Sequence, residues 1–148
     1  MAELRSVQQR KADVRATLDR NGHAWLATAA GSVPYVITVQ TVWDGESILV
    51  TTRQSSRTAR NLEQSRVARL ALGDAEDAIV IEATLLRAFP AVDASPQRTA
   101  FVRAAGWDPG EQGPDWRLFV LRPTRIQAYR GYAEIEGRDV MKDGHWLA

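Results

Sequence analysis

Hydroxyl and guanidinium side chains are concentrated in one short segment of the chain, which contains Thr51, Thr52, Arg53, Ser55, Ser56, Arg57 and Arg60. A serine ahead of a run of good helix formers is typical of a helix N-cap, so a helix is predicted to begin directly after Ser56. Arg57 and Arg60 are three residues apart and would share one face of that helix. A helix N-terminus presents free N–H groups and a partial positive charge. Two guanidinium groups beside it would favour a phosphate.

The same residues also have a plainer interpretation, in which the serines only cap the helix and the arginines are solvated surface side chains. Basic side chains at a helix start oppose the helix dipole, at a cost of about 0.3 kcal/mol or more. A bound anion would compensate for that cost. The residues alone leave both interpretations open.

Short strands are predicted on both sides of this segment. Runs rich in β-branched and aromatic residues, separated by turn residues, predict strands over 23–30, 35–43, 47–52, 67–72, 78–86, 116–121 and 125–129. Two further helices are predicted over 3–20 and over 95–105, the second with Pro96 in its first turn. The tail from 131 to 148 has no clear period, apart from a turn at Asp143-Gly144.

Short links join most of these strands, so the expected fold is mainly β (α+β). We expect a closed or nearly closed antiparallel barrel with peripheral helices. A chain of 148 residues fits one domain, and no linker or internal repeat divides it. The sequence therefore predicts a single domain over residues 1–148.

Composition excludes several kinds of chemistry. The absence of cysteine removes disulfides, thiolate nucleophiles and iron–sulfur clusters, and two histidines make a poor ligand set, so no metal site is predicted. A net charge of +1 argues against a nucleic-acid partner. No apolar run approaches the ~20 residues of a membrane span, and no signal peptide is recognised, so we expect a cytoplasmic protein without a membrane partner.

Four consecutive segments of the chain carry a family resemblance: Pro34–Val39, the hairpin that follows it, Val50–Thr52 and Ser56–Glu63. Together they resemble the pyridoxamine 5′-phosphate oxidase-like split-barrel superfamily. The resemblance implies an antiparallel split β-barrel that binds FMN or the 5-deazaflavin coenzyme F420 at a homodimer interface. It also implies the residues that hold the cofactor. These are Ile37, Thr38 and Val39 beside the ring, Thr51 and Thr52 at a strand end, Ser56, Arg57 and Arg60 around the phosphate, and Tyr129 and Arg138 near the end of the chain.

Two positions in the same segment bear on the choice of cofactor. The superfamily commonly has lysine where this chain has Thr58. Thr58 is counted among the residues near the cofactor, but the resemblance implies that this departure removes one phosphate contact. A lysine at position 58 would be expected to restore it as a partly exposed contact. Arg53 would suit an anionic tail such as that of F420, but FMN fits the remaining residues equally.

The first functional hypothesis is an oxidoreductase that transfers hydride between the cofactor and a small organic substrate. The cofactor would carry the chemistry, so no catalytic side chain is assigned. A second hypothesis is a non-enzymatic flavin or haem carrier on the same barrel, although no histidine stands where an axial haem ligand is expected. A nucleic-acid-binding barrel that uses the arginines is the third, and the near-zero net charge disfavours it.

Overall fold

The computed structural model describes residues 3–148, and within them nine strands form one sheet. Its main path runs in the order β2 (Val33–Gln40), β1 (His23–Ala30), β5 (Val67–Asp74), β6 (Asp77–Pro90), β7 (Trp116–Tyr129), β4 (Ile48–Arg53) and β3 (Val42–Trp43). β8 (Asp139–Lys142) pairs with β7 and with β9 (His145–Trp146). Each pairing is antiparallel.

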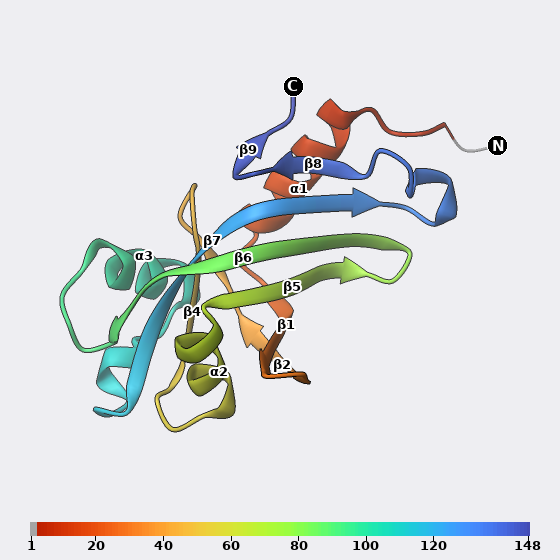
Figure 1. Ribbon diagram of the computed structural model, residues 1–148. Coiled ribbons are helices and arrows are strands. Elements are labelled where there is room, and N and C mark those ends of the chain that lie inside the picture. The colour runs from red at the N-terminus through yellow and green to blue at the C-terminus, as the bar shows by residue number, and fades with distance from the viewer. Residues whose placement is uncertain (1–2) are drawn as a thin grey trace.

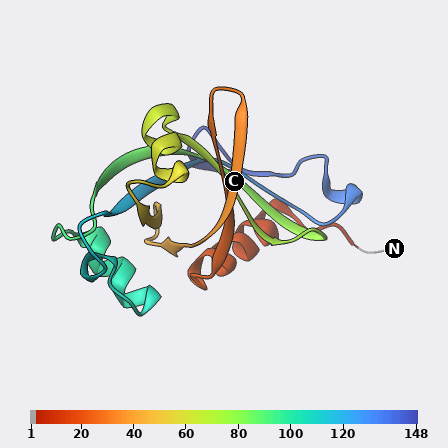
Figure 2. The ribbon, with the colours of Figure 1, turned by 90° about the horizontal axis from the view of Figure 1, so that it is seen from below.

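The two ends of this path, β2 and β3, are consecutive in sequence and only Thr41 separates them. The Thr41 N–H donates to the Gly22 carbonyl oxygen over 2.9 Å, so the chain changes direction between them. The predicted strand over 35–43 is therefore divided at Thr41. The sheet is strongly curled (Figures 1 and 2), which gives the predicted α+β antiparallel split barrel.

Three helices pack against this sheet, α1 (Val7–Asp19), α2 (Arg57–Ser65) and α3 (Pro96–Ala105), and two short 3₁₀ turns, η1 (Pro109–Glu111) and η2 (Tyr132–Glu134), lie in the connections. Figure 1 shows α2 and α3 at one end of the molecule and the β5–β6 turn and η2 at the opposite end. α1 begins at Val7 and not at the predicted Glu3, because Ser6 and Gln9 form a reciprocal capping box. None of the helices within residues 3–148 has the length and hydropathy needed to cross a lipid bilayer.

The core has two parts, which lie on opposite faces of β4 and β7. Val50, Phe119 and Leu121 belong to the larger cluster, which lines the inside of the barrel. Leu49 and Leu118 belong to a smaller cluster that packs around Phe101 of α3. α3 therefore covers the outside of these two strands, so that both of their faces are buried.

β6 and β7 are longer than predicted and run through the whole barrel. The predicted strands over 116–121 and 125–129 are one 14-residue strand, because a bulge accommodates the proline between them. Glu82 pairs with Arg125 and Ala83 pairs with Pro123, so Thr124 is the additional residue. The tail, in which the sequence shows no clear period, contains β8 and β9, which the predicted turn at Asp143-Gly144 joins.

Candidate functional site

The turn from β4 into α2 has the predicted capping geometry. Ser56 is the N-cap of α2, and its hydroxyl oxygen accepts a hydrogen bond from the Ala59 N–H over 3.1 Å. The Thr52 hydroxyl at the end of β4 donates to the same oxygen over 3.2 Å. The Ser56 N–H donates to the Arg53 carbonyl oxygen over 3.0 Å, which closes the turn. The strand end and the helix start are thus held together by short-range polar contacts.

The three arginines around this turn, Arg53, Arg57 and Arg60, are all exposed, and we call them the arginine group. Within residues 3–148 none of them forms an ion pair with a carboxylate. The Arg60 guanidinium donates to the Ser55 carbonyl oxygen over 3.0 Å. Positive charge thus accumulates at the positive end of the α2 dipole without neutralisation by the fold, which is the electrostatic arrangement that an anion requires.

One carboxylate borders the turn and limits which donors are free. Asp115 accepts a hydrogen bond from the Ser55 hydroxyl over 2.8 Å, and its carbonyl oxygen accepts from the Gln54 N–H over 2.7 Å. The Ser55 hydroxyl proton is therefore committed to the protein. The donors left for an anion are mainly those of the arginine group.

Thr58 does not lie partly exposed beside these arginines, and this expectation from the sequence is wrong. Its side chain is only 2% exposed, and its hydroxyl oxygen is buried without a hydrogen-bond partner. Thr58 lies on the face of α2 that packs against the barrel, together with Ala59, Asn61 and Leu62. The Asn61 amide donates to the Thr28 hydroxyl of β1 over 3.2 Å, so the buried face of α2 is unusually polar.

The other residues predicted on this side of the barrel lie on β4 and β2. Thr51 and Thr52 are half-buried, and the Thr51 hydroxyl donates to the Arg117 carbonyl oxygen over 2.7 Å. Ile37 and Thr38 are exposed and Val39 is half-buried on β2, which ends the strand path. A strand at the end of a sheet leaves one row of backbone N–H and C=O groups unpaired, and these groups are available to a ligand.

Tyr129 and Arg138 lie at the other end of the molecule. Trp116 at the start of β7 pairs with Arg53, whereas Tyr129 at its end pairs with Ala78 of β6. The ends of a 14-residue strand are about 40 Å apart along its path. The Arg138 guanidinium is bonded locally, to the Ile135 carbonyl oxygen. A single chain therefore does not bring these two residues to the arginine group.

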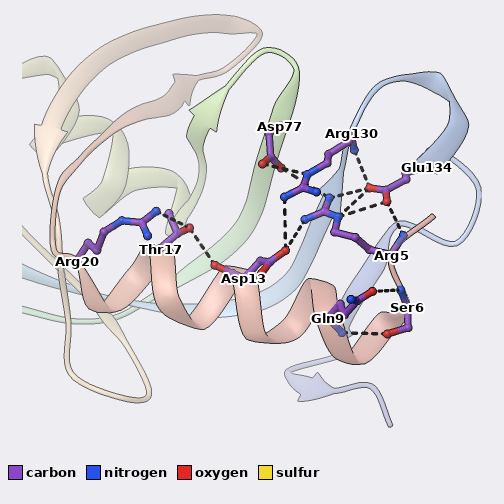
Figure 3. A network of polar contacts seen from close by, with 9 residues as sticks. All are labelled: Arg5, Ser6, Gln9, Asp13, Thr17, Arg20, Asp77, Arg130 and Glu134. Atoms are coloured by element: carbon purple, nitrogen blue, oxygen red, sulfur yellow. Dashed lines mark hydrogen bonds and ion pairs between the residues drawn. The ribbon is translucent and has the colours of Figure 1, made fainter. Parts of the chain in front are cut away.

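Sequence reasoning missed a dense charge network at that far end (Figure 3). The buried Glu134 carboxylate accepts hydrogen bonds from the Arg5 guanidinium at 2.7 Å, the Arg5 N–H at 2.9 Å and the Arg130 N–H at 2.8 Å. These contacts, with the guanidinium bonds first, lower the pKa of Glu134 to about 2 although burial opposes the charge. Asp13 and Asp77 complete the network around Arg5. No local pattern could reveal it, because Arg5 and Glu134 are 129 residues apart.

A groove of about 420 Å³ lies on the outer face of the sheet, away from the arginine group. Its lining includes Ala27, Ala29, Pro34, Val67 and Glu82, and no residue from 51 to 60. Glu82 there forms ion pairs with arginines on the neighbouring strands, at 3.2 Å on β5 and 3.8 Å on β7. The groove is therefore largely apolar, with one neutralised carboxylate.

No protein-family model and no curated protein matches the sequence. Solved structures do resemble the fold. An F420 reductase superposes with a TM-score of 0.63 at 20% identity, over 76% of this chain and 94% of that one. A haem storage protein from Vibrio cholerae superposes with a TM-score of 0.63 at 17% identity, over 92% and 99%. A protein related to general stress protein 26, of the pyridoxinephosphate oxidase family, from Clostridium acetobutylicum gives 0.60 at 12% identity, over 84% and 90%.

Proposed function

Because the chain has the split-barrel fold of pyridoxamine 5′-phosphate oxidase-like proteins, we propose that it binds a phosphate-bearing flavin-type cofactor, FMN or coenzyme F420, at the start of α2. We propose further that it transfers hydride to or from a small organic molecule. The observation that carries this proposal is the arginine group, three exposed cations without an acid partner in residues 3–148 at the positive end of a capped helix. The cytoplasmic location stays a prediction.

The donors present fit a phosphate ester. Arg57 and Arg60 would hold its oxygens, and Arg53 would reach an additional anionic group if the cofactor has one. The free edge of β2 at Ile37–Val39 would present backbone groups to the polar edge of the ring. When bound, the ring supplies the hydride chemistry, while the protein binds, orients and shields it. No side chain of this chain is assigned to a proton transfer.

We also propose that the protein is a homodimer that shares the cofactor between its subunits. Tyr129 and Arg138, which the family resemblance assigns to the site, are too far from the arginine group within one chain, but a second copy could supply them. The outer face of the sheet is a suitable contact surface, because Trp25, Val36 and Val67 are each more than 50% exposed there. An apolar patch of this kind is typical of an interface.

A carrier that binds the cofactor without turnover is the second candidate. The resemblance to a haem storage protein supports it. Both histidines, His23 and His145, are exposed and lie outside the arginine group. This placement favours a flavin over a haem as the carried group.

Titration of the purified protein with FMN, coenzyme F420, haem and single-stranded DNA tests these proposals together. We expect FMN or F420 to bind, and riboflavin to bind more weakly than FMN if FMN is the ligand. Saturation by haem alone would favour the carrier, and saturation by DNA alone would exclude a flavin site.

Light scattering at micromolar concentration tests the proposed homodimer and should give about twice the 16.4 kDa of the chain. Trp25→Asp should shift that mass towards the monomer.

A further inference from the structure

Two members of the arginine group lie next to aromatic rings that come from two different strands. The Arg57 guanidinium carbon lies 5.3 Å from the centroid of the Tyr35 ring on β2. The Arg53 guanidinium carbon lies 5.6 Å from the ring of Trp116, the first residue of β7. Both distances are within the range of a cation–π contact.

Trp116 is itself fixed by a series of edge-to-face contacts that begins in the core. Its ring meets Trp107 at 5.7 Å and 79°, and Trp107 meets Phe101 of α3 at 5.6 Å and 84°. Phe101 is fully buried in the smaller hydrophobic cluster. The Trp107 indole N–H also donates to the Gln40 side chain at the end of β2, over 2.8 Å. The connection between β6 and β7, residues 91–115, therefore supports Trp116 and contacts the strand that carries Tyr35.

Such contacts matter because an exposed arginine is otherwise free to rotate. A guanidinium that must be ordered when its ligand binds loses side-chain entropy, and this loss weakens binding. A ring next to the guanidinium restricts it beforehand, and the ring accepts none of the hydrogen bonds that a phosphate would accept from the guanidinium N–H groups.

We propose that Tyr35 and Trp116 are positioning residues of the anion site, which hold Arg57 and Arg53 ready for the phosphate. The β6–β7 connection, which contains α3 and η1, would then contribute to ligand binding, because its residues Phe101 and Trp107 hold Trp116 in place. This inference rests on the proposed function. It adds residues that would act only through the arginines and would not touch the cofactor ring.

The test compares a cofactor with its phosphate-free counterpart. Wild-type protein is titrated with FMN and riboflavin, and with F420 and the deazaflavin lacking the phosphate-bearing tail, and the pair that binds is used. The preference for the phosphorylated form is the ratio of the two dissociation constants. We expect Tyr35→Leu and Trp116→Leu each to reduce this preference by about two- to fivefold, the size of an exposed cation–π contact. Tyr35→Phe keeps the ring and should retain the wild-type preference.

A matched control is available at another place in the chain. Arg15 lies 4.7 Å from the ring of Trp146, so Trp146→Leu removes the same kind of contact away from α2 and should leave the preference unchanged. A structural defect would weaken both ligands of a pair equally and leave the ratio constant. If wild type shows no preference for the phosphorylated form, the proposed function fails and this inference fails with it. If wild type shows the preference and both Tyr35→Leu and Trp116→Leu retain it, only the positioning role is overturned.

Discussion

Two groups of arginines, one at each end of the barrel, differ in whether carboxylates pair with them, although Arg98 and Arg117 at the α2 and α3 end do form ion pairs. At the end formed by η2 and the β5–β6 turn, Arg5 and Arg130 are paired with Glu134, Asp13 and Asp77 (Figure 3). The Glu134 carboxylate is buried and accepts hydrogen bonds from both the backbone and the guanidinium of Arg5. The positive charges there are neutralised within the chain, and the network ties the segment before α1 to the residues that follow β7.

At the other end, Arg53, Arg57 and Arg60 have no carboxylate partner within residues 3–148. They are exposed, so water solvates them at little cost, but the fold gains nothing from their charge. The comparison teaches that the two kinds of arginine can be separated by measurement. Changes in the paired group around Arg5 should alter stability, whereas changes in the arginine group, the unpaired one, should alter ligand binding.

The largest effect is expected in the paired group around Arg5. Glu134→Gln removes the only buried carboxylate among the three that pair with Arg5 in residues 3–148, and breaking a buried pair on one side costs about 3 kcal/mol. Urea denaturation should show this loss in the free energy of unfolding. The affinity for the cofactor should stay unchanged when it is measured where the variant is still folded. A loss below about 0.5 kcal/mol would mean that the network is not a stabilising element.

The same carboxylate sets a pH dependence. Its pKa in the folded protein is about 2, below the ordinary value of 4.5. A lowered pKa stabilises the folded state above the unfolded value, and this contribution is lost as the pH falls from about 4.5 towards about 2. Wild type should therefore lose more stability across this window than Glu134→Gln, which has no carboxyl group at this position to titrate.

A smaller effect, of the opposite kind, is expected in the arginine group. Arg57→Ala and Arg60→Ala should each weaken cofactor binding by about 1.5–3 kcal/mol, the range for hydrogen bonds to charged groups. Their free energies of unfolding should change by less than about 0.5 kcal/mol, because both side chains are exposed. Calorimetric titration measures the affinity, with Arg15→Ala as an arginine control outside the group. Unchanged dissociation constants for both variants would remove the phosphate site.

The start of α2 could be predicted because its signals are local. The Ser56 cap and the shared exposure of Arg57 and Arg60 follow from residue types within a few positions of each other. The hairpins and the barrel followed from strand patterns and turn residues in the same way. The continuous course of β7 was missed, because a proline usually ends a strand and the bulge at Thr124 depends on the partner strand.

The supports of the site could not be predicted because they join distant segments. Tyr35 and Trp116 meet Arg57 and Arg53 only after β2, β4 and β7 are assembled, and Trp107 reaches Gln40 across 67 residues. The orientation of α2 about its own axis also depends on that assembly. This orientation of α2 places Thr58 against the barrel, whereas the sequence suggested a partly exposed position.

The smallest effect is expected at Thr58, whose side chain carries a buried hydroxyl group. Its hydroxyl has no hydrogen-bond partner, and an unsatisfied buried polar group is a net cost to folding. Thr58→Val has nearly the same shape and removes that group, so it should raise the free energy of unfolding by about 1 kcal/mol in urea denaturation. Cofactor affinity should not change, because the side chain does not reach the exposed face of α2.

Thr58→Lys should instead destabilise the protein, since it forces a longer, charged side chain into the same space. If the valine variant is less stable than wild type, the hydroxyl has a partner in solution, and a lysine that strengthens binding would show that residue 58 reaches the ligand after all.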